Sequence, residues 1–509
     1  MPPGDRAIGR PASGLRPPTS PGLPSMRPRT APILVLIASA GLVAGLAGML
    51  RNREIPLGVP GEWTWSRLGP GIRPVAADVG LALAGLALYA GFAAIGRRDL
   101  GRERPGRGRE AAWVAALVGL GAAAQVAAMG AAPPGYGIAK AVTLAMSGSS
   151  GYFHVAREEM ADPSAFLASY PEWIQEQDVY HIGTHPPGLF VLSRAALGLM
   201  DSSPGLARAV DDAMPDQLDN AFRQIIGPMP RADRSALVLV AVLTLLASAS
   251  ASAPLYLMLR GSGASPAVSW SSAALWPLVP SAVLFQPTAD AAFPLLSASA
   301  VALATRRGPA ASVLAGAVLA AGMACSLVFL AVGLIVGLTM ATSPGEPARR
   351  RVSRFVLTGV GFLVPTLLGW AATGANPFAI WWWNQRNHAG FYVEHPRSYL
   401  AWLAANPVEL AVGLGLPATA WGLVAMAGGR APRVSWLSLA VLAVLTLSGR
   451  NLSEVGRLWL PFFPMLLAAA GPGQDRMGGG AATLGGTAAL MAVQVVAMEL
   501  TIQVVYPVS

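Results

Sequence analysis

The stretch Ile33-Leu-Val-Leu-Ile-Ala-Ser-Ala-Gly-Leu-Val-Ala-Gly-Leu-Ala-Gly-Met-Leu50 contains 18 residues and no charge. A helix that crosses a bilayer needs roughly 17 to 25 mostly apolar residues, so this stretch predicts a transmembrane helix. The composition of the 509-residue chain agrees, because 53% of its residues are hydrophobic and only 12% are charged. A soluble protein of this size is far less apolar. The sequence therefore predicts an all-α polytopic membrane protein.

Further apolar runs predict about 13 transmembrane helices in all. The expected spans cover residues 33–50, 75–96, 112–132, 236–258, 267–286, 289–305, 310–323, 325–341, 355–373, 403–427, 434–448, 457–471 and 480–505. The run 310–342 is read as two short helices that turn near Gly322. This turn would keep the arginines at 306–307 and 349–351 on one side of the membrane.

Four regions follow from this pattern. Residues 1–32 are rich in proline and arginine, which predicts a disordered basic tail in the cytoplasm. Residues 33–132 hold the N-terminal helices, residues 133–235 form a large outer loop, and residues 236–509 form a transmembrane bundle. Within the outer loop, 152–160 and 206–226 mix apolar and charged residues and predict amphipathic interfacial helices. The apolar piece 189–200 is too short to span and is expected to be re-entrant or interfacial.

The net charge of +10 comes almost wholly from arginine, since Lys140 is the only lysine. The arginines fall in short segments between apolar runs, which is typical of topology signals and not of nucleic-acid binding. The densest basic segment, residues 97–109, is therefore expected in the cytoplasm with the tail. We expect a multi-pass protein of the cell (inner) membrane whose active face is periplasmic or extracellular.

Under this topology the residues suited to chemistry collect on the outer face. All five histidines fall there, together with one aspartate, one glutamate and two arginines near the ends of spans: His154, His181, His185, His388, His395, Asp290, Glu454, Arg397 and Arg457. Ionisable groups at membrane depth are costly and mark functional sites. The sequence therefore predicts one outer site.

The segment Asp178-Val-Tyr-His-Ile-Gly-Thr-His-Pro-Pro-Gly188 is the densest group of such residues. The diproline removes two backbone donors and pushes His185 towards an extended conformation, so we expect a fixed turn and not a helix. That makes a zinc site on His181 and His185 a weak hypothesis, and a divalent ion held by Asp178 and one histidine is the alternative. His185, Arg397 and Arg457 are suited to donating hydrogen bonds to a phosphate, although each arginine can also be a snorkelling side chain.

Asp290 follows Phe285-Gln-Pro-Thr-Ala at the outer edge of a span. A partly desolvated carboxylate there could act as a general base, and it could equally cap the helix that begins at residue 291. The single cysteine, Cys325, lies inside an apolar run, so one chain offers no thiolate metal site.

The order of these motifs resembles the GT-C polyprenyl-phosphate-dependent glycosyltransferases. It is similar to the bacterial branch of protein mannosyltransferases, aminoarabinose transferases and RgtA/B/C/D-like proteins. The resemblance rests on four short motifs between residues 111 and 471: Tyr152-Phe-His-Val-Ala-Arg-Glu-Glu-Met160, Thr184-His-Pro-Pro-Gly188, Pro287-Thr-Ala-Asp290 and Glu454-Val-Gly-Arg-Leu-Trp-Leu-Pro-Phe-Phe-Pro464.

This resemblance implies a membrane glycosyltransferase that moves a sugar from a polyprenyl-phosphate donor to a glycan, lipid or protein acceptor, within membrane lipid and without nucleic acid. It implies that a carboxylate deprotonates the acceptor. It also implies that binding residues, with or without a divalent cation (Mg or Mn), hold the donor and its phosphate. The implied catalytic carboxylates are Asp290, Asp178, Glu158 and Glu159, and the implied binding residues are His185, His181, Tyr152, Arg397, Arg457 and Glu454.

Two features depart from the family pattern. The family's acidic pair is missing, because Ser147-Gly-Ser-Ser-Gly151 precedes Tyr152. Either the base comes from Glu158, Glu159, Asp162, Asp178 or Glu62, or the activity has changed. Two additional spans also precede the outer loop. The alternatives are a transporter or flippase for a lipid-linked or envelope component, and a non-catalytic membrane protein of GT-C type.

Overall fold

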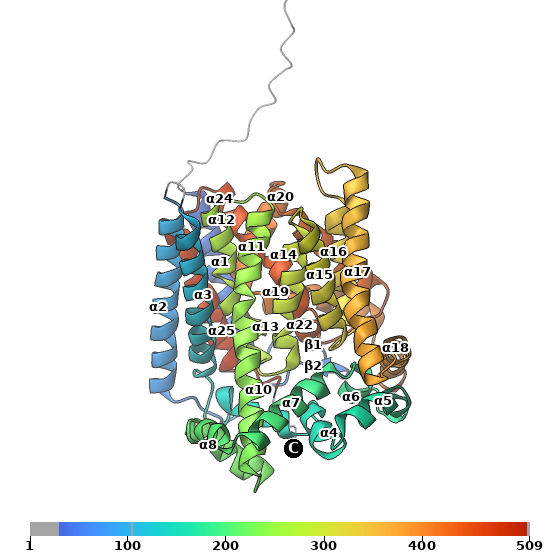
Figure 1. Cartoon of the computed structure of the whole chain (residues 1–509). Helices are drawn as coiled ribbons and strands as arrows, with labels where there is room; N and C mark the ends of the chain where they lie inside the picture. Colours follow the sequence, from blue (N-terminus) through green and yellow to red (C-terminus); the bar gives the residue numbers. More distant parts are fainter. Residues whose placement is uncertain (1–29, 103–104, 506–509) are drawn as a thin grey trace, which may run out of the picture.

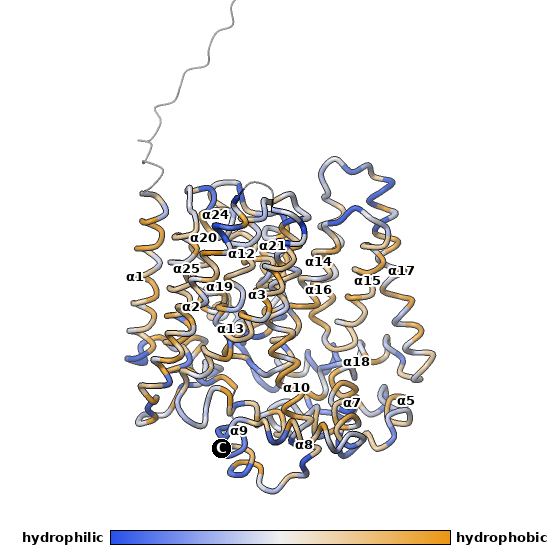
Figure 2. Tube along the Cα trace, turned by 60° about the vertical axis from the view of Figure 1, so that its left-hand side comes forward, coloured by the Kyte–Doolittle hydropathy of each residue, from blue (hydrophilic) through white to orange (hydrophobic). Residues whose placement is uncertain are grey.

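The computed structural model describes residues 30–102 and 105–505, and the predicted tail lies outside it up to residue 29. The described chain is a bundle of helices with one small two-stranded ribbon, and a layer of short helices covers one end of the bundle (Figure 1). Hydrophobic residues occupy the middle of the bundle, whereas hydrophilic residues collect towards its two ends (Figure 2).

Six helices among the described residues are long and apolar enough to cross a membrane. They are α1 (Ala31–Arg51), α2 (Ala76–Leu100), α3 (Arg107–Met129), the continuous pair α10 (Arg231–Ser250) and α11 (Ser252–Gly261), α17 (Ala348–Thr373) and α25 (Ala481–Glu499). A seventh span would consist of α19 (Tyr399–Leu414) and α20 (Leu416–Ala427), which meet at a bend of 108°. The protein is therefore a mostly helical membrane protein.

Shorter apolar helices complete the bundle. They are α14 (Phe293–Ala304), which follows the 3-10 turn η5 (Ala289–Ala291), together with α15 (Pro309–Met323), α16 (Val328–Ala341) and α21 (Arg433–Leu447). The expected turn near Gly322 is confirmed, because α15 ends at Met323 and α16 starts at Val328. A side chain at Gly322 would collide with the ring of Phe329, so this glycine lets the two helices approach closely.

Three predicted spans are wrong as continuous helices. Residues 267–286 divide into α12 (Pro266–Ala273), η4 (Trp276–Leu278) and α13 (Pro280–Leu284), and residues 457–471 into α22 (Val455–Leu458), η6 (Leu460–Phe462), α23 (Phe463–Leu467) and the start of α24 (Ala470–Arg476). Prolines at 277, 280, 461 and 464 cause these breaks, because proline lacks the amide hydrogen and clashes with the preceding turn. The span 403–427 bends at Gly415, whose φ of +101° suits glycine.

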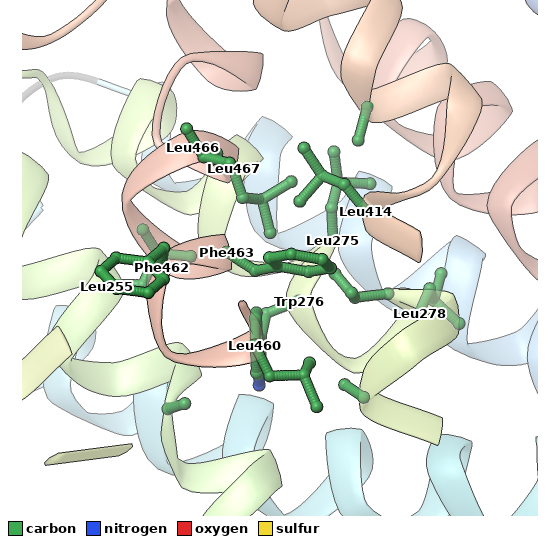
Figure 3. Close-up of a cluster of buried hydrophobic side chains, with 14 of the residues drawn as sticks. Leu255, Leu275, Trp276, Leu278, Leu414, Leu460, Phe462, Phe463, Leu466 and Leu467 are labelled. Atoms are coloured by element: carbon green, nitrogen blue, oxygen red, sulfur yellow. The ribbon is translucent and has the colours of Figure 1, made fainter. Parts of the chain in front are cut away.

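The broken segments form the centre of the hydrophobic core. Leu460, Phe462 and Phe463 are fully buried and pack in a cluster with Leu255 and Trp276 (Figure 3). The indole of Trp276 also donates a hydrogen bond of 2.6 Å to the carbonyl of Ser248. Such close packing holds helices together inside a bilayer, where the lipid tails are as apolar as the side chains. The packing of this cluster fixes the position of α22, which immediately precedes it in the chain.

The layer at one end of the bundle is formed mainly by residues 137–226. It contains η1 (Gly137–Ala145), α4 (Tyr152–Glu158), α5 (Pro163–Trp173), η2 (Ile174–Glu176), α6 (His181–Thr184), α7 (Gly188–Ser202), α8 (Pro204–Asp212), α9 (Asp216–Ala221) and η3 (Phe222–Ile226), and α18 (Pro377–Glu394) joins it. Strands β1 (Gly58–Val59) and β2 (Trp63–Thr64) pair antiparallel in a loop at the same end. Helices are present within 152–160 and 206–226, as expected, and residues 189–200 belong to α7.

A buried ion pair ties this layer to the bundle. The ammonium of Lys140 in η1 lies 3.3 Å from a carboxylate oxygen of Glu499 in α25. It also donates to the carbonyls of Val283 and Leu284, each at 3.1 Å. The remaining donors of a buried cation are thus paired, which such a group requires. Lys140 therefore joins η1, α13 and α25.

Candidate functional site

The turn that contains the two histidines is helical for one turn and then extended. Residues 181–184 form α6, and His185 has φ −115° and ψ 141°. The extended His185 confirms its predicted conformation, because a residue before proline avoids the helical region. The expectation of no helix was wrong, since this restriction applies to His185 and not to the four residues before it.

Side-chain amides complete the backbone hydrogen bonds of this turn. Gly183 and its neighbours lack the usual helical donors because residues 186 and 187 are prolines without N–H groups. Asn384 donates to the carbonyls of Gly183 (3.1 Å) and His185 (3.2 Å), and Asn387 donates to that of Gly183 (2.9 Å). The hydroxyl of Tyr170 donates to the His185 carbonyl at 2.8 Å. Helix α18 and Tyr170 therefore hold the turn rigid.

Gly183 is required by a close approach. A Cβ atom there would lie 1.8 Å from the carbonyl oxygen of Asp178. The side chain of Asp178 is exposed, and its oxygen accepts a hydrogen bond of 2.9 Å from the amide of Tyr180. Asp178 therefore shapes the start of the turn.

Arg457 in α22 lies between two carboxylates. Its Nη2 is 2.6 Å from Glu454, and its Nε is 3.9 Å from Asp290. The latter distance is an ion pair but too long for a hydrogen bond. The Nε atom is buried and has no hydrogen-bond partner among the described residues. Arg457 thus keeps an unused donor although its side chain is only 18% exposed.

The two histidines and Tyr152 complete the group around this arginine. Burial lowers the pKa of His181 well below its usual range, and the positive charge of Arg457 lowers it further. Burial also raises the pKa of Tyr152 well above its usual range, with a contribution from the charge of Asp290. The ring of Tyr152 contacts that of His185 edge-on, at 5.6 Å between centroids.

We call these residues the arginine–histidine site; its members are Tyr152, His181, His185, Asp290, Glu454 and Arg457. They come from α4, α6 and the residue after it, η5, the residue before α22, and α22 itself. The structure therefore brings together one of the four expected catalytic carboxylates and five of the six expected binding residues.

His185 is neutral at pH 7 and has a defined tautomer. Burial lowers its pKa to about 4; the hydrogen bond to His181 raises it, and the charge of Arg457 lowers it again. Its Nδ1 lies 2.9 Å from the carbonyl oxygen of His181, so Nδ1 carries the proton. The remaining nitrogen, Nε2, is then a hydrogen-bond acceptor. In this state Nε2 of His185 accepts hydrogen bonds, and the expected role of His185 at a phosphate stays a prediction.

The other expected carboxylates lie elsewhere. Glu158 pairs with His154 at 3.1 Å, and Glu159 accepts a hydrogen bond of 2.7 Å from the indole of Trp173. Glu158 at the end of α4 and Glu159 immediately after it are exposed, whereas Phe153 on α4 is buried. The pattern of α4 therefore turns them away from the packed face that contains Phe153.

Arg397 belongs to a neighbouring group and not to the arginine–histidine site. Its guanidinium donates to the carbonyl of Glu62 at 3.0 Å and lies 5.6 Å above the ring centre of Phe391. The carboxylate of Glu62 accepts hydrogen bonds from the Ser398 amide (3.0 Å) and the Trp402 indole (2.7 Å). Glu62 and Arg397 therefore attach the β1–β2 loop to the start of α19.

Asp290 is not the expected helix cap. It lies inside η5, and α14 begins after Ala292 without any side-chain hydrogen bond at its cap. The partial exposure of the Asp290 side chain, 19%, leaves room for another partner. The role of general base thus remains open to it.

Three residues of this end were not predicted from the sequence. Asn384 and Asn387 act through partners about two hundred residues away, which no local pattern reveals. Glu409 is fully buried in α19, which packs against α22, and its carboxylate faces the indole of Trp65 and the backbone of Gly456 and Val455. Its position as a single acid in an apolar helix was the available signal.

Within residues 30–102 and 105–505, no three His, Cys, Asp or Glu side chains gather as metal ligands. The fold and site together define a polytopic membrane protein with a half-buried arginine between carboxylates and histidines. No protein-family model, curated protein or solved structure matches this chain.

Proposed function

We propose that this protein is a membrane glycosyltransferase of GT-C type that transfers a sugar from a polyprenyl-phosphate donor to an acceptor. The observation that carries the proposal is Arg457, whose buried Nε lacks a partner among the described residues while Asp290 lies 3.9 Å away. A guanidinium binds phosphate oxygens in a fork, and a carboxylate beside it can accept a proton. Glycosyl transfer from a phosphate needs a base for the acceptor hydroxyl and a cation for the leaving phosphate.

The proposed topology has about 13 helices, counting the short and broken ones as spans. The arginine–histidine site would face the periplasm or the exterior, where the layer formed by residues 137–226 meets the bundle, in the cell (inner) membrane. The arginine-rich loops at the opposite end of the bundle support this orientation through the positive-inside rule.

In the proposed reaction, Asp290 takes the proton of the acceptor hydroxyl. The acceptor oxygen then forms a bond to the anomeric carbon of the sugar. The bond between that carbon and the phosphate oxygen breaks, and polyprenyl phosphate leaves with the electron pair. Arg457 stabilises the negative charge that develops on this phosphate, while Glu454, at 2.6 Å, orients the guanidinium.

The histidines respond to this change of charge. The leaving phosphate gains a second negative charge, which favours a proton on a nearby imidazole. Protonation of His185 at Nε2 would turn this acceptor into a donor for the product phosphate. A divalent cation such as Mg or Mn would need oxygen ligands from the substrate in addition to Asp290 and Glu454, because both carboxylates already face Arg457.

The test is turnover by purified protein with labelled polyprenyl-phosphate sugars, comparing Asp290→Asn with Asp178→Asn. Each change neutralises one candidate carboxylate with little change of shape. Loss of a general base lowers kcat by about 100- to 10,000-fold. We expect that loss for Asp290→Asn and turnover close to that of the natural protein for Asp178→Asn.

The reverse result would assign the base to Asp178 and contradict this site. Equal turnover by both variants would remove the proposed role of Asp290. Movement of intact lipid-linked sugar across a vesicle membrane, without release of polyprenyl phosphate, would instead support a flippase.

A further inference from the structure

A large cavity lies at the end of the bundle opposite the arginine–histidine site. It has a volume of about 1060 Å³ and is bordered by the ends of α11, α14, α16, α21 and α24. Four arginines line it, and we call it the arginine cavity: Arg307, Arg430, Arg433 and Arg476. Arg307 and Arg430 lie in two separate connections, Arg433 starts α21 and Arg476 ends α24, so the fold and not a local run of sequence gathers them.

Backbone carbonyls hold these arginines in place. Arg307 donates to the carbonyl of Pro344 at 2.9 Å, Arg476 to that of Gly428 at 2.8 Å, and Arg433 to that of Thr342. A carbonyl fixes a guanidinium but does not neutralise its charge. The cavity therefore presents oriented cations.

Carboxylates at this end are already paired with other arginines. In the described part of the chain, Asp99 pairs with Arg109, Glu110 with Arg260, Glu346 with Arg354 and Asp475 with Arg97. Of these four acids only Asp475 lines the arginine cavity. None of the four arginines of the cavity has an ion-pair partner among the described residues. Four cations against one anion leave an excess of three positive charges.

Two details of the arginine cavity indicate that its arginines are arranged to bind an anion. The Nε atom of Arg433 is buried and has no hydrogen-bond partner among the described residues. At Gly428, a Cβ atom would lie 2.1 Å from Nε of Arg476, so the absence of a side chain there provides the seat for this arginine. An unused buried donor normally finds a partner, and none of the described residues supplies one for Nε of Arg433.

We propose that the arginine cavity binds the phosphodiester of an anionic phospholipid headgroup. Arginine forks match phosphate oxygens, and basic pockets between membrane helices on the cytoplasmic side bind such headgroups. The lining also includes Leu259, Val268 and Val434, which suits a ligand with an apolar part. This site is separate from the proposed transferase site, and neither depends on the other.

The experiment uses the full-length protein in a zwitterionic detergent, titrated with phosphatidylglycerol that carries a fluorescent acyl chain. Phosphatidylcholine with the same label and inorganic phosphate as competitor are the parallel arms. We expect phosphatidylglycerol to bind and phosphatidylcholine to bind at least about tenfold more weakly, because the choline cation beside the same phosphodiester is repelled by the four arginines. Displacement of the lipid by millimolar phosphate would support the same phosphate contacts.

Two variants locate the binding. Arg433→Gln with Arg476→Gln should weaken phosphatidylglycerol binding by about 100-fold, at about tenfold for each arginine. The matched control is Arg349→Gln with Arg350→Gln, which removes the same charge at the same end but outside the cavity, and should change affinity less than about threefold. Gly428→Ala keeps every charge and should still weaken binding, because it displaces Arg476.

Equal weakening by the two double variants would overturn the proposal, since the effect would then be one of net charge. Equal binding of phosphatidylglycerol and phosphatidylcholine would also overturn it. Binding of inorganic phosphate without any lipid binding would overturn the lipid as occupant. Thermal unfolding of each variant separates lost binding from lost folding.

Discussion

Replacing Asn384 and Asn387 with alanine, singly and together, tests how the histidine turn is held. The carbonyl of Gly183 accepts from both amides, at 3.1 and 2.9 Å. Its ordinary helical donor would be the N–H of residue 187, which is proline. Each single variant therefore leaves Gly183 with one partner, and only the double variant leaves it with none.

The magnitudes follow from this count. Asn384→Ala removes two hydrogen bonds, to Gly183 and His185, and Asn387→Ala removes two, to Gly183 and Ile174. At about 0.5 to 1.5 kcal/mol for each bond, either variant should lower the free energy of unfolding by about 1 to 3 kcal/mol. A buried carbonyl left without a partner costs a further amount of about 1 to 3 kcal/mol. The double variant should exceed the sum of the singles by that amount.

The assay is unfolding of the detergent-solubilised protein by heat and by denaturant, with Asn406→Ala as the matched control. Asn406 is also buried and donates to one carbonyl, that of Asn451, at 2.9 Å, away from the turn. Its combination with Asn384→Ala should be additive within about 0.5 kcal/mol. Additive costs for Asn384 and Asn387 as well would refute the argument that Gly183 depends on these two amides alone.

Two further predictions concern the arginine–histidine site. Arg457→Gln removes the partner of Glu454 at 2.6 Å and should lower the free energy of unfolding by about 3 kcal/mol. The double variant Arg457→Met with Glu454→Leu should restore much of that stability. The absence of such a recovery in thermal unfolding would contradict the prediction. Burial lowers the pKa of His185 from 6.5 to about 4, so the unfolded chain binds this proton more readily than the folded one. The free energy of unfolding should therefore fall as the pH drops from about 6.5 towards 4, by at most about 3 kcal/mol. His185→Gln should reduce this acid loss in unfolding measured across that pH range, and an unchanged slope would show that other groups cause it.

The long apolar helices could be predicted because their signal is local. Residues 33–50, 75–96 and 112–132 contain no interrupting proline and coincide with α1, α2 and α3. The segments with prolines 277, 280, 461 and 464 are equally apolar but break into short pieces. Hydropathy records only the preference for lipid, whereas the backbone geometry at each proline decides continuity.

The composition of the candidate site could be predicted in part. Asp290, Glu454 and Arg457 stood out as charges beside apolar runs, and the structure pairs them. The roles of Asn384 and Asn387 could not be found, because they depend on contacts across the chain. The proton position on His185 also required the structure, since it follows from the distance to the His181 carbonyl.

The central proposal is that the arginine–histidine site cleaves the bond between a sugar and a polyprenyl phosphate. The most direct measurement follows purified natural-sequence protein with a polyprenyl-phosphate sugar that is labelled in both the sugar and the lipid. The proposal predicts one polyprenyl phosphate released for each sugar transferred to an acceptor hydroxyl, with inversion at the anomeric carbon. Recovery of the donor intact across a broad set of sugars and acceptors would contradict it.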